Sequence, residues 1–315
     1  MPTAETSCIV CGANNFIFED RKDAKADGET VTIALCQNCG HVQIADVPDP
    51  ETLRRFYSEE YRLSFRSARH PKPKHVLRAG RRATRRLARL EGWLHKGDRL
   101  LDIGSGGGEF VYLATRRGVR ASGIDPASDY LSFAQDAYGI DVRDTEIAAL
   151  EPDGSFDVVT MFHVLEHLPD PTATFRIAFD LLADGGRFVV EVPNLDATNT
   201  SPTNHFFKAH ISYFTKTSLA RLAAAGFEVE VMEADKVLFA VFTKRHDWRA
   251  DLEPSAFDLP DVQAIASSKL AMQNRNFLRY LASGGPLNGL RKLVRVVEEP
   301  ASAYGAAPKE LLDRF

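Results

Sequence analysis

The 315-residue sequence is short of three features: long apolar runs, cysteine and, in one stretch, acidic residues. No stretch of eighteen or more apolar residues occurs, and the opening MPTAETSC lacks the basic and then apolar pattern of a secretory signal. We therefore expect a soluble, cytoplasmic protein without a membrane span. The formal net charge is only −4, yet residues 61–90 hold eleven Lys and Arg and no Asp or Glu. Any basic surface should thus be local.

The few cysteines are confined to the first forty residues, where they form two Cys-x2-Cys pairs. They are Cys8, Cys11, Cys36 and Cys39. In a cytoplasmic protein, two such pairs predict a tetrahedral zinc site rather than disulfides. Four thiolates leave no open coordination position, so the predicted Zn²⁺ is structural, and it supplies much of the folding free energy of a small β zinc ribbon. His41 is either a competing ligand or a partly exposed side chain beside the ribbon.

Residues 100–110, LLDIGSGGGEF, read as a buried strand, a glycine-rich turn and the start of a helix. The dinucleotide pattern G-x-G-x-x-G is missing, because Glu109 stands at its third glycine, where a pyrophosphate would approach. Instead, Asp102 is followed by alternating glycines at 104, 106 and 108. An acid and small residues suit a cofactor that carries an ammonium and a sulfonium instead of phosphates.

This loop resembles the first motif of the class I S-adenosylmethionine-dependent methyltransferases, and segments 119–125, 155–162 and 185–194 follow in that family's order and spacing. The resemblance covers roughly residues 97–244. It implies an α/β fold with a Rossmann-like, seven-stranded, mostly parallel sheet whose last strand is antiparallel. It also implies S-adenosylmethionine as cofactor, with the acid after the second strand accepting both ribose hydroxyls. The implied cofactor-binding residues are Asp102, Gly104, Ser105, Gly106, Asp125, Glu146, Ile147 and Phe162.

We expect four parts along the chain: a zinc ribbon at 1–47, a helical linker or lid at 48–95, the methyltransferase domain at 96–245 and a C-terminal helical extension at 246–315. The arginine-rich helix of the linker either binds an anion, such as a nucleic acid, or is a solvated helix beside the sheet. Tyr57 and Tyr61, near its start, either close over the cofactor or pack between ribbon and domain. For the extension, a homodimer contact through its helices, a lid and a packing appendix all stay open.

The segment HVLEHLPDP contains His163-x-x-Glu166-His167, which also has the H-x-x-E-H form of inverted zinc peptidases. That motif needs a long helix, whereas this segment follows a strand and meets Pro169 two residues after His167. Some relatives that methylate catechol-like quinone precursors hold a divalent cation here with an acid-x-x-Glu-His pattern. The resemblance thus implies a second divalent cation at Glu166 and His167, although His163 replaces the acid. Alternatively, Glu166 and His167 support the fold and His163 faces the pocket.

Residues 194–214 form a polar loop leading into aromatics and histidines, after a central strand and hence at the edge where open α/β sheets bind substrates. Its end resembles the Glu-His-x-x-Tyr-Phe element of sugar C-methyltransferases, with Ala209 in place of the glutamate. The alternative role of this element is to pack the loop. The predicted catalytic residues are His163, His210 and Tyr213. The predicted substrate-binding residues are Glu166, His167, Asn194 and His205.

O-methylation of a hydroxyl on a sugar, glycan or specialised metabolite is the predicted function, because histidine titrates near neutrality and can remove a hydroxyl proton. His163 or His210 would be the base and Tyr213 would orient the acceptor. Alternatives are C-methylation of a nucleotide-linked keto sugar, RNA methylation, and an inactive methyltransferase-fold binding module. The expected partner is a small-molecule or glycan acceptor. A nucleic acid is less favoured, because the fourth strand lacks the Asn-Pro or Asp-Pro pair of nucleobase and protein N-methyltransferases.

Overall fold

The computed structural model describes residues 6–24, 28–49, 52, 71–126, 128–201, 205–256, 260–273, 277–283, 303 and 305–315. The chain divides into two compact units. The first unit comprises residues 1–49, 162–179 and 188–289, and the second comprises residues 50–161, 180–187 and 290–315. The predicted roles of Tyr57 and Tyr61 concern residues outside the described ranges.

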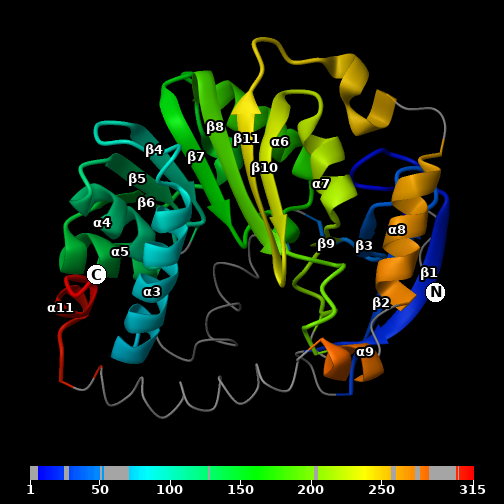
Figure 1. Cartoon of the computed structure of the whole chain (residues 1–315), viewed down its shortest axis with the longest axis horizontal. Coiled ribbons are helices and arrows are strands. Elements are labelled where there is room, and N and C mark those ends of the chain that lie inside the picture. The colour runs from blue at the N-terminus through cyan, green and yellow to red at the C-terminus, as the bar shows by residue number, and fades with distance from the viewer. Residues whose placement is uncertain are drawn as a thin grey trace. The chain divides into compact units, whose positions relative to one another are not determined.

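Seven strands form the large sheet, in the order β10-β11-β8-β7-β4-β5-β6 (Figure 1). They are β4 (Arg99–Ile103), β5 (Arg120–Ile124), β6 (Asp141–Arg143), β7 (Phe156–Phe162), β8 (Leu182–Pro193), β10 (Phe227–Ala234) and β11 (Val237–Lys244). Strand β4 pairs in parallel with β5 and β7, and β5 pairs in parallel with β6, whereas β10 and β11 are antiparallel. The predicted mostly parallel sheet with an antiparallel last strand is confirmed.

Helices α3 (Pro73–Arg89), α4 (Glu109–Arg116) and α5 (Ser128–Tyr138) accompany β4 to β6 in the second unit (Figure 1). A proline in the first turn of α3 fits a helix start, because its N–H would have no intrahelical partner there. Val76, Leu77, Ala83 and Leu87 of α3 are buried, and α11 (Pro308–Leu312) packs against this helix. The Tyr112 hydroxyl donates to Oδ1 of Asp313 at 2.5 Å, and Arg116 pairs with the same oxygen at 2.6 Å. The last residues of the chain thus belong to the second unit.

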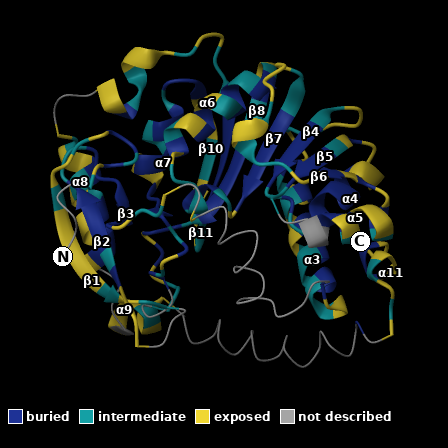
Figure 2. Ribbon diagram, turned by 180° about the vertical axis from the view of Figure 1, so that it is seen from behind, coloured by how far each residue is buried: buried dark blue, intermediate teal, exposed yellow. Residues whose placement is uncertain are grey.

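A four-stranded sheet in the first unit has the order β1-β2-β3-β9. Its strands are β1 (Phe16–Lys22), β2 (Thr30–Cys36), β3 (Val42–Ile44) and β9 (Ser212–Tyr213). The outer strand β1 is largely exposed, whereas β2 and β3 are mostly buried (Figure 2). The antiparallel sheet that carries the cysteines confirms the predicted N-terminal ribbon, and its fourth strand comes from the distant loop that precedes α7.

The other helices within the described residues are α6 (Pro171–Leu181), α7 (Lys216–Ala223), α8 (Val262–Gln273) and α9 (Phe277–Ala282), with short turns η2 (Ile147–Ala149), η3 (Leu165–His167), η4 (Ala250–Leu252) and η5 (Pro254–Ala256). Thr215 caps α7, because its hydroxyl accepts from the N–H of Ser218. Phe175 packs edge-to-face on Phe188 and Phe242, with ring centroids 5.1 and 5.6 Å apart, and forms part of the first unit's core. Among the described residues, none of the helices is both long and apolar enough to cross a membrane.

Candidate functional site

The glycine loop after β4 is tied to β5 by three hydrogen bonds. The N–H groups of Gly104 and Ser105 donate to the carbonyl oxygen of Ile124 at 2.8 and 2.9 Å, and the N–H of Gly106 donates to Oδ2 of Asp125 at 2.9 Å. Gly104 and Gly106 have φ angles of +75° and +58°, which favour glycine. A Cβ at Gly106 would meet no described atom within 4 Å, so there is open space beside the loop. The Asp125 carboxylate is therefore held at a position that a cofactor can approach.

Asp102, the last residue but one of β4, is buried and accepts a hydrogen bond at Oδ1 from the Thr160 hydroxyl at 2.7 Å. Burial raises the pKa of Asp102 to about 7, although the Thr160 bond and the charge of Arg86 lower it. The buried hydroxyl of Ser105 has no hydrogen-bond partner among the described residues. A buried acid and an unpaired hydroxyl beside a glycine loop fit the polar amino-acid end of S-adenosylmethionine.

The other predicted cofactor residues follow the neighbouring strands. Glu146 occupies the N-cap position of η2, three residues after β6, and Phe162 is the buried last residue of β7. Ile147 begins η2 and is partly exposed. Because β4 to β7 run parallel, these residues lie at or just after the carboxyl ends of their strands, which form the edge where such sheets bind ligands. Their contact with a cofactor stays a prediction.

The four cysteine thiols of the ribbon are free, buried and gathered in one cluster. The Sγ atoms of Cys8 and Cys39 are 3.6 Å apart, as are those of Cys11 and Cys36, and all four lie within 4.8 Å of one another. Tetrahedral zinc with Zn–S bonds of ~2.3 Å places its sulfurs roughly 3.8 Å apart, whereas a disulfide needs ~2.05 Å. The donor set and its spacing fit one structural zinc ion.

The glycines after each cysteine pair close the two metal-binding turns. Gly12 and Gly40 have φ angles of +73° and +72°, and their N–H groups donate to the carbonyl oxygens of Cys8 and Cys36. Asn38 donates to two of the sulfurs: its backbone N–H lies 3.4 Å from Sγ of Cys36 and its Nδ2 lies 3.8 Å from Sγ of Cys11. The glycines therefore shape the turns, and other N–H groups orient the thiolates.

His41 lies beside the ribbon's second cysteine pair and is fully buried rather than partly exposed. Its Nε2 lies 3.2 Å from the Ser212 hydroxyl, and burial lowers its pKa to about 4. The four cysteines already supply a complete tetrahedral set, so His41 is a hydrogen-bonding partner of β9 and no fifth ligand is required.

The second cluster of titratable groups surrounds the carboxylate of Glu166, which is only 1% exposed. Oε1 of Glu166 lies 3.2 Å from Nδ1 of His163, 3.9 Å from Nε2 of His210 and 4.0 Å from Nε2 of His167. Oε2 of Glu166 has no hydrogen-bond partner among the described residues. Nδ1 of His167 lies 2.7 Å from the carbonyl oxygen of Ala209, so it carries the proton. Three of the predicted histidines thus meet at one buried acid.

His163 links Glu166 to a second acid, Glu191, which the sequence analysis missed. The Nε2 atom of His163 lies 3.4 Å from Oε1 of Glu191, and its backbone N–H donates to the Glu191 carbonyl oxygen at 2.7 Å. Burial lowers the pKa of His163, but hydrogen bonds to the two carboxylates outweigh this and raise it to about 9. Burial likewise raises the pKa of Glu166, but His163 and the neighbouring histidines lower it to about 2. The signal for Glu191 was a lone acid within the apolar run 188–192.

The Tyr213 hydroxyl is bonded within its own loop. It accepts from the Phe207 N–H at 3.2 Å and donates to the Phe207 carbonyl oxygen at 3.1 Å, and burial raises its pKa. His205 lies against the rings of Phe206 and Tyr213, with centroids 5.1 and 5.9 Å away. These contacts hold the loop in shape, and a role of Tyr213 or His205 toward an acceptor stays a prediction.

The side-chain amide of Asn194 is also hydrogen-bonded to the backbone. Its Nδ2 donates to the carbonyl oxygen of Asp235 at 2.8 Å, and its Oδ1 accepts from the N–H of Asp196 at 2.9 Å. The residue is buried and forms a bridge with Phe214. These bonds fix the turn after β8, so Asn194 has a structural task besides the predicted contact with a substrate.

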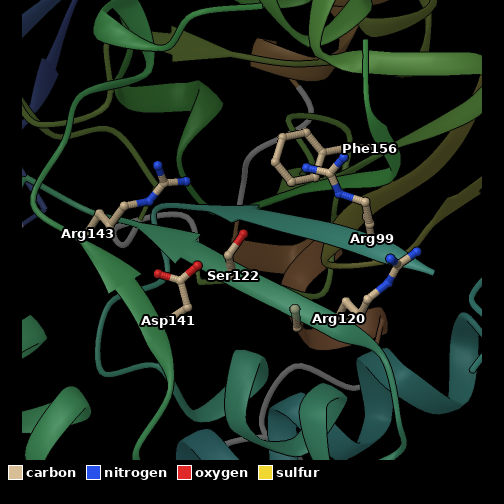
Figure 3. Close-up of a pocket in the computed structure, with 7 residues that line it drawn as sticks. Arg99, Arg120, Ser122, Asp141, Arg143 and Phe156 are labelled. Carbon is tan, nitrogen blue, oxygen red and sulfur yellow. The ribbon is translucent and has the colours of Figure 1, made fainter. Parts of the chain in front are cut away.

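A hollow of about 380 Å³ lies elsewhere in the second unit, near the amino ends of its strands (Figure 3). Arg99, Arg120 and Phe156 begin β4, β5 and β7, and Arg143 lies at the opposite side of the hollow. The Arg99 guanidinium lies 5.2 Å from the centre of the Phe156 ring. With Asp141 the hollow contains three basic groups and one acid, so it favours anions. It contains none of the predicted site residues.

Residues 74–231, about half of the chain, match the family described as "Methyltransferase domain". A ubiquinone biosynthesis O-methyltransferase of Xanthomonas oryzae pv. oryzae is 37% identical over 106 residues, which cover 31% of this chain and 44% of that protein. One from Psychrobacter arcticus is 37% identical over 120 residues, covering 35% and 45%. The chain thus spans less than half the length of these curated relatives.

Among solved structures, the chain is similar to 1,6-didemethyltoxoflavin-N1-methyltransferase of Burkholderia thailandensis, which was solved with 1,6-didemethyltoxoflavin and S-adenosylhomocysteine bound. The TM-score is 0.47 at 20% identity, and the alignment covers 72% of this chain and 99% of that one.

Proposed function

Since the chain belongs to the class I S-adenosylmethionine-dependent methyltransferases, matched over residues 74–231, we propose that it methylates a hydroxyl group of a sugar, glycan or specialised metabolite. The observation that carries the proposal is the cluster in which the buried carboxylate of Glu166 faces three histidines. The names of the ubiquinone O-methyltransferases, 37% identical over about a third of this chain, also favour oxygen as the methylated atom.

Bound S-adenosylmethionine would supply an electrophilic methyl group on a sulfonium. The residues that would hold it are Asp102, Gly104, Ser105, Gly106, Asp125, Glu146, Ile147 and Phe162. Asp125 would accept the ribose hydroxyls, and Asp102 would stand near the ammonium, where an ionised carboxylate is favourable. These residues bind and orient, and they leave proton transfer to the histidine cluster.

We assign the general base to His210 rather than His163. With a pKa of about 9, His163 carries a proton at neutral pH and cannot accept another. Nε2 of His210 faces Glu166 at 3.9 Å, so a proton on Nε2 leaves Nδ1 to accept the acceptor's hydroxyl proton. The Glu166 carboxylate would stabilise the imidazolium that forms. The protonated His163, 40% exposed, would attract an electron-rich oxygen of the acceptor.

The same cluster could alternatively bind a divalent cation. Ligand atoms of Glu166, His167 and His210 lie within 4.8 Å of one another, and Oε2 of Glu166 has no partner among the described residues. Imidazole and carboxylate ligands suit Zn²⁺ or Fe²⁺ better than Mg²⁺. Metal analysis separates the two uses, since a cation here raises the metal content above the single zinc proposed for the cysteines.

RNA methylation is supported by one observation, the arginine hollow between Arg99 and Arg143. A protein that neutralises several phosphates there would lose affinity steeply with salt. C-methylation of a keto sugar would use the same histidine base on a carbon-bound proton. It therefore predicts deuterium uptake by the substrate without consumption of the cofactor.

The experiment that tests the proposal is a screen of labelled S-adenosylmethionine against nucleotide sugars, extracted glycans, phenolic metabolites and RNA. Label in a hydroxyl acceptor is expected with the wild type and not with His210→Ala. Asp125→Ala should lose most of its affinity for S-adenosylhomocysteine in calorimetry. Unchanged affinity would contradict the cofactor assignment, and full turnover by His210→Ala would contradict the base.

A further inference from the structure

Strand β9 links the cysteine ribbon to the loop that carries His210. It pairs antiparallel with β3, with Val42 opposite Tyr213 and Gln43 opposite Ser212, and the N–H of Ile44 donates to the carbonyl oxygen of Ile211 at 3.0 Å. β9 is thus the fourth strand of the ribbon's sheet, and both its ends are within two residues of a proposed site residue (Figure 1).

The pairing is reinforced by buried side chains. Nε2 of His41 lies 3.2 Å from the Ser212 hydroxyl, with His41 0% and Ser212 1% exposed. The His41 ring also contacts Phe214, with centroids 5.7 Å apart. Ser212 begins β9 and Phe214 directly follows it, so the His41 side chain contacts this segment at two positions. Gln43 contacts the first cysteine turn, because its Oε1 accepts a hydrogen bond from the N–H of Ile9 at 3.0 Å.

The opposite edge of the same segment contacts the histidine cluster. The N–H of Ile211 donates to the carbonyl oxygen of Glu166 at 2.8 Å, and the N–H of Leu195 donates to that of Phe214 at 2.8 Å. Residues 211–214 therefore lie between β3 on one side and Glu166 on the other. A displacement of β9 from the ribbon would shift the position of His210 relative to Glu166.

We propose that the ribbon is a positioning element of the acceptor site, and that His41 and Ser212 are the positioning residues through which it fixes His210. This inference rests on the proposed function, because it assigns the ribbon a task in that site. The proposed task differs from a purely structural one. The ribbon's own fold depends on β1 to β3 and the cysteines, whereas the His41–Ser212 contact attaches β9 to the ribbon. Loss of that contact should alter His210 without releasing the metal.

The test uses the full chain with Ser212→Ala, which removes the hydroxyl alone. Ser268→Ala is the matched control, because Ser268 is a buried serine of the same unit whose hydroxyl has no partner among the described residues. Ser212→Thr keeps a hydroxyl at the position. Four readouts are compared: zinc content, affinity for S-adenosylhomocysteine, NMR signals of the His210 ring, and hydrogen exchange of the Ile211 amide.

We expect Ser212→Ala to shift the His210 ring signals and to speed exchange of the Ile211 amide by about tenfold, as loss of one buried hydrogen bond implies. Zinc content and S-adenosylhomocysteine affinity should stay at wild-type values, Ser268→Ala should change nothing, and Ser212→Thr should restore the His210 signals. Unchanged His210 signals and exchange in Ser212→Ala would overturn the inference. Failure of the wild type to bind S-adenosylhomocysteine would instead overturn the proposed function, so the two failures are distinguishable.

Discussion

Replacing Glu166 with glutamine should lower the pKa of His163. The substitution keeps the size of the side chain and an oxygen that can accept from Nδ1 of His163 at 3.2 Å, but it removes the negative charge. Burial alone lowers the pKa of a histidine, and in His163 the two carboxylates overcome this effect. In Glu166→Gln, Glu191, 3.4 Å from Nε2 of His163, is the one remaining carboxylate of the two that raise the pKa of His163. We expect it to offset only part of the lowering that burial causes.

The size of the effect follows from the two pKa values. An ordinary histidine titrates at 6.5 and His163 at about 9, which corresponds to about 3 kcal/mol of interaction between the charged ring and its surroundings. Because the side chain is 40% exposed, solvent screening reduces this to about 1 kcal/mol. The folded-state pKa is raised, so the stabilisation is complete below pH 6.5 and is lost as the pH rises through about 9. In Glu166→Gln this loss should be smaller and should occur at lower pH.

The assay is an NMR titration of the histidine ring signals, with His163 assigned by a His163→Asn variant. Glu191→Gln is the control, and it should lower the pKa of His163 less, because that contact is longer and Glu191 is 11% exposed against 1% for Glu166. A wild-type His163 that titrates near 6.5, or one that titrates identically in Glu166→Gln, would refute the pairing. Either result would also make His163 a candidate for the general base again.

Three further predictions concern the ribbon and the cofactor loop. Cys39→Ser should reduce zinc from about one ion per chain, measured by elemental analysis, and should lower the melting temperature before it affects chemistry; full zinc retention would contradict the four-cysteine site. Gly12→Ala should cost about 1 kcal/mol of stability through its positive φ, whereas Gly40→Ala should cost more, since its Cβ would lie 2.5 Å from the backbone of Ala264; equal melting temperatures would contradict that close contact. S-adenosylmethionine affinity should fall below pH 7 as Asp102 becomes neutral, and calorimetry showing no pH dependence would argue against its contact with the ammonium.

Features with a local signal could be predicted from the sequence. The acid and alternating glycines of residues 102–108 predict a strand end, a turn with positive φ and a helix that follows, and each feature is present, with α4 beginning at Glu109. The cysteine pairs predict a cluster because tetrahedral binding leaves little freedom in ligand spacing. Thr215 precedes the apolar positions of α7 and is a residue type that favours an N-cap, and it caps the helix in the structure.

Features that depend on distant pairing could not be predicted. Val42 and Tyr213 are opposite each other in one sheet, but a two-residue strand in a polar loop has no periodicity by which to recognise it. The full burial of His41 follows from the same pairing. Asn194 and Tyr213 are predicted substrate contacts from their place after a central strand and from the resemblance, and neither signal tells whether an amide or hydroxyl is already bonded to the backbone.

The backbone of His163 has an unusual conformation at the point where its ring meets two carboxylates. His163 has a φ of +59°, in the left-handed region that costs a residue with a Cβ roughly 1–2 kcal/mol. β7 ends at Phe162, and the left-handed residue that follows it places both ring nitrogens near carboxylates, Nδ1 3.2 Å from Glu166 and Nε2 3.4 Å from Glu191. The hydrogen bond from its N–H to Glu191 and the two ion pairs offset the cost. Strained backbone conformations are concentrated at functional sites, so the conformation of His163 favours the proposed role of this cluster in the reaction.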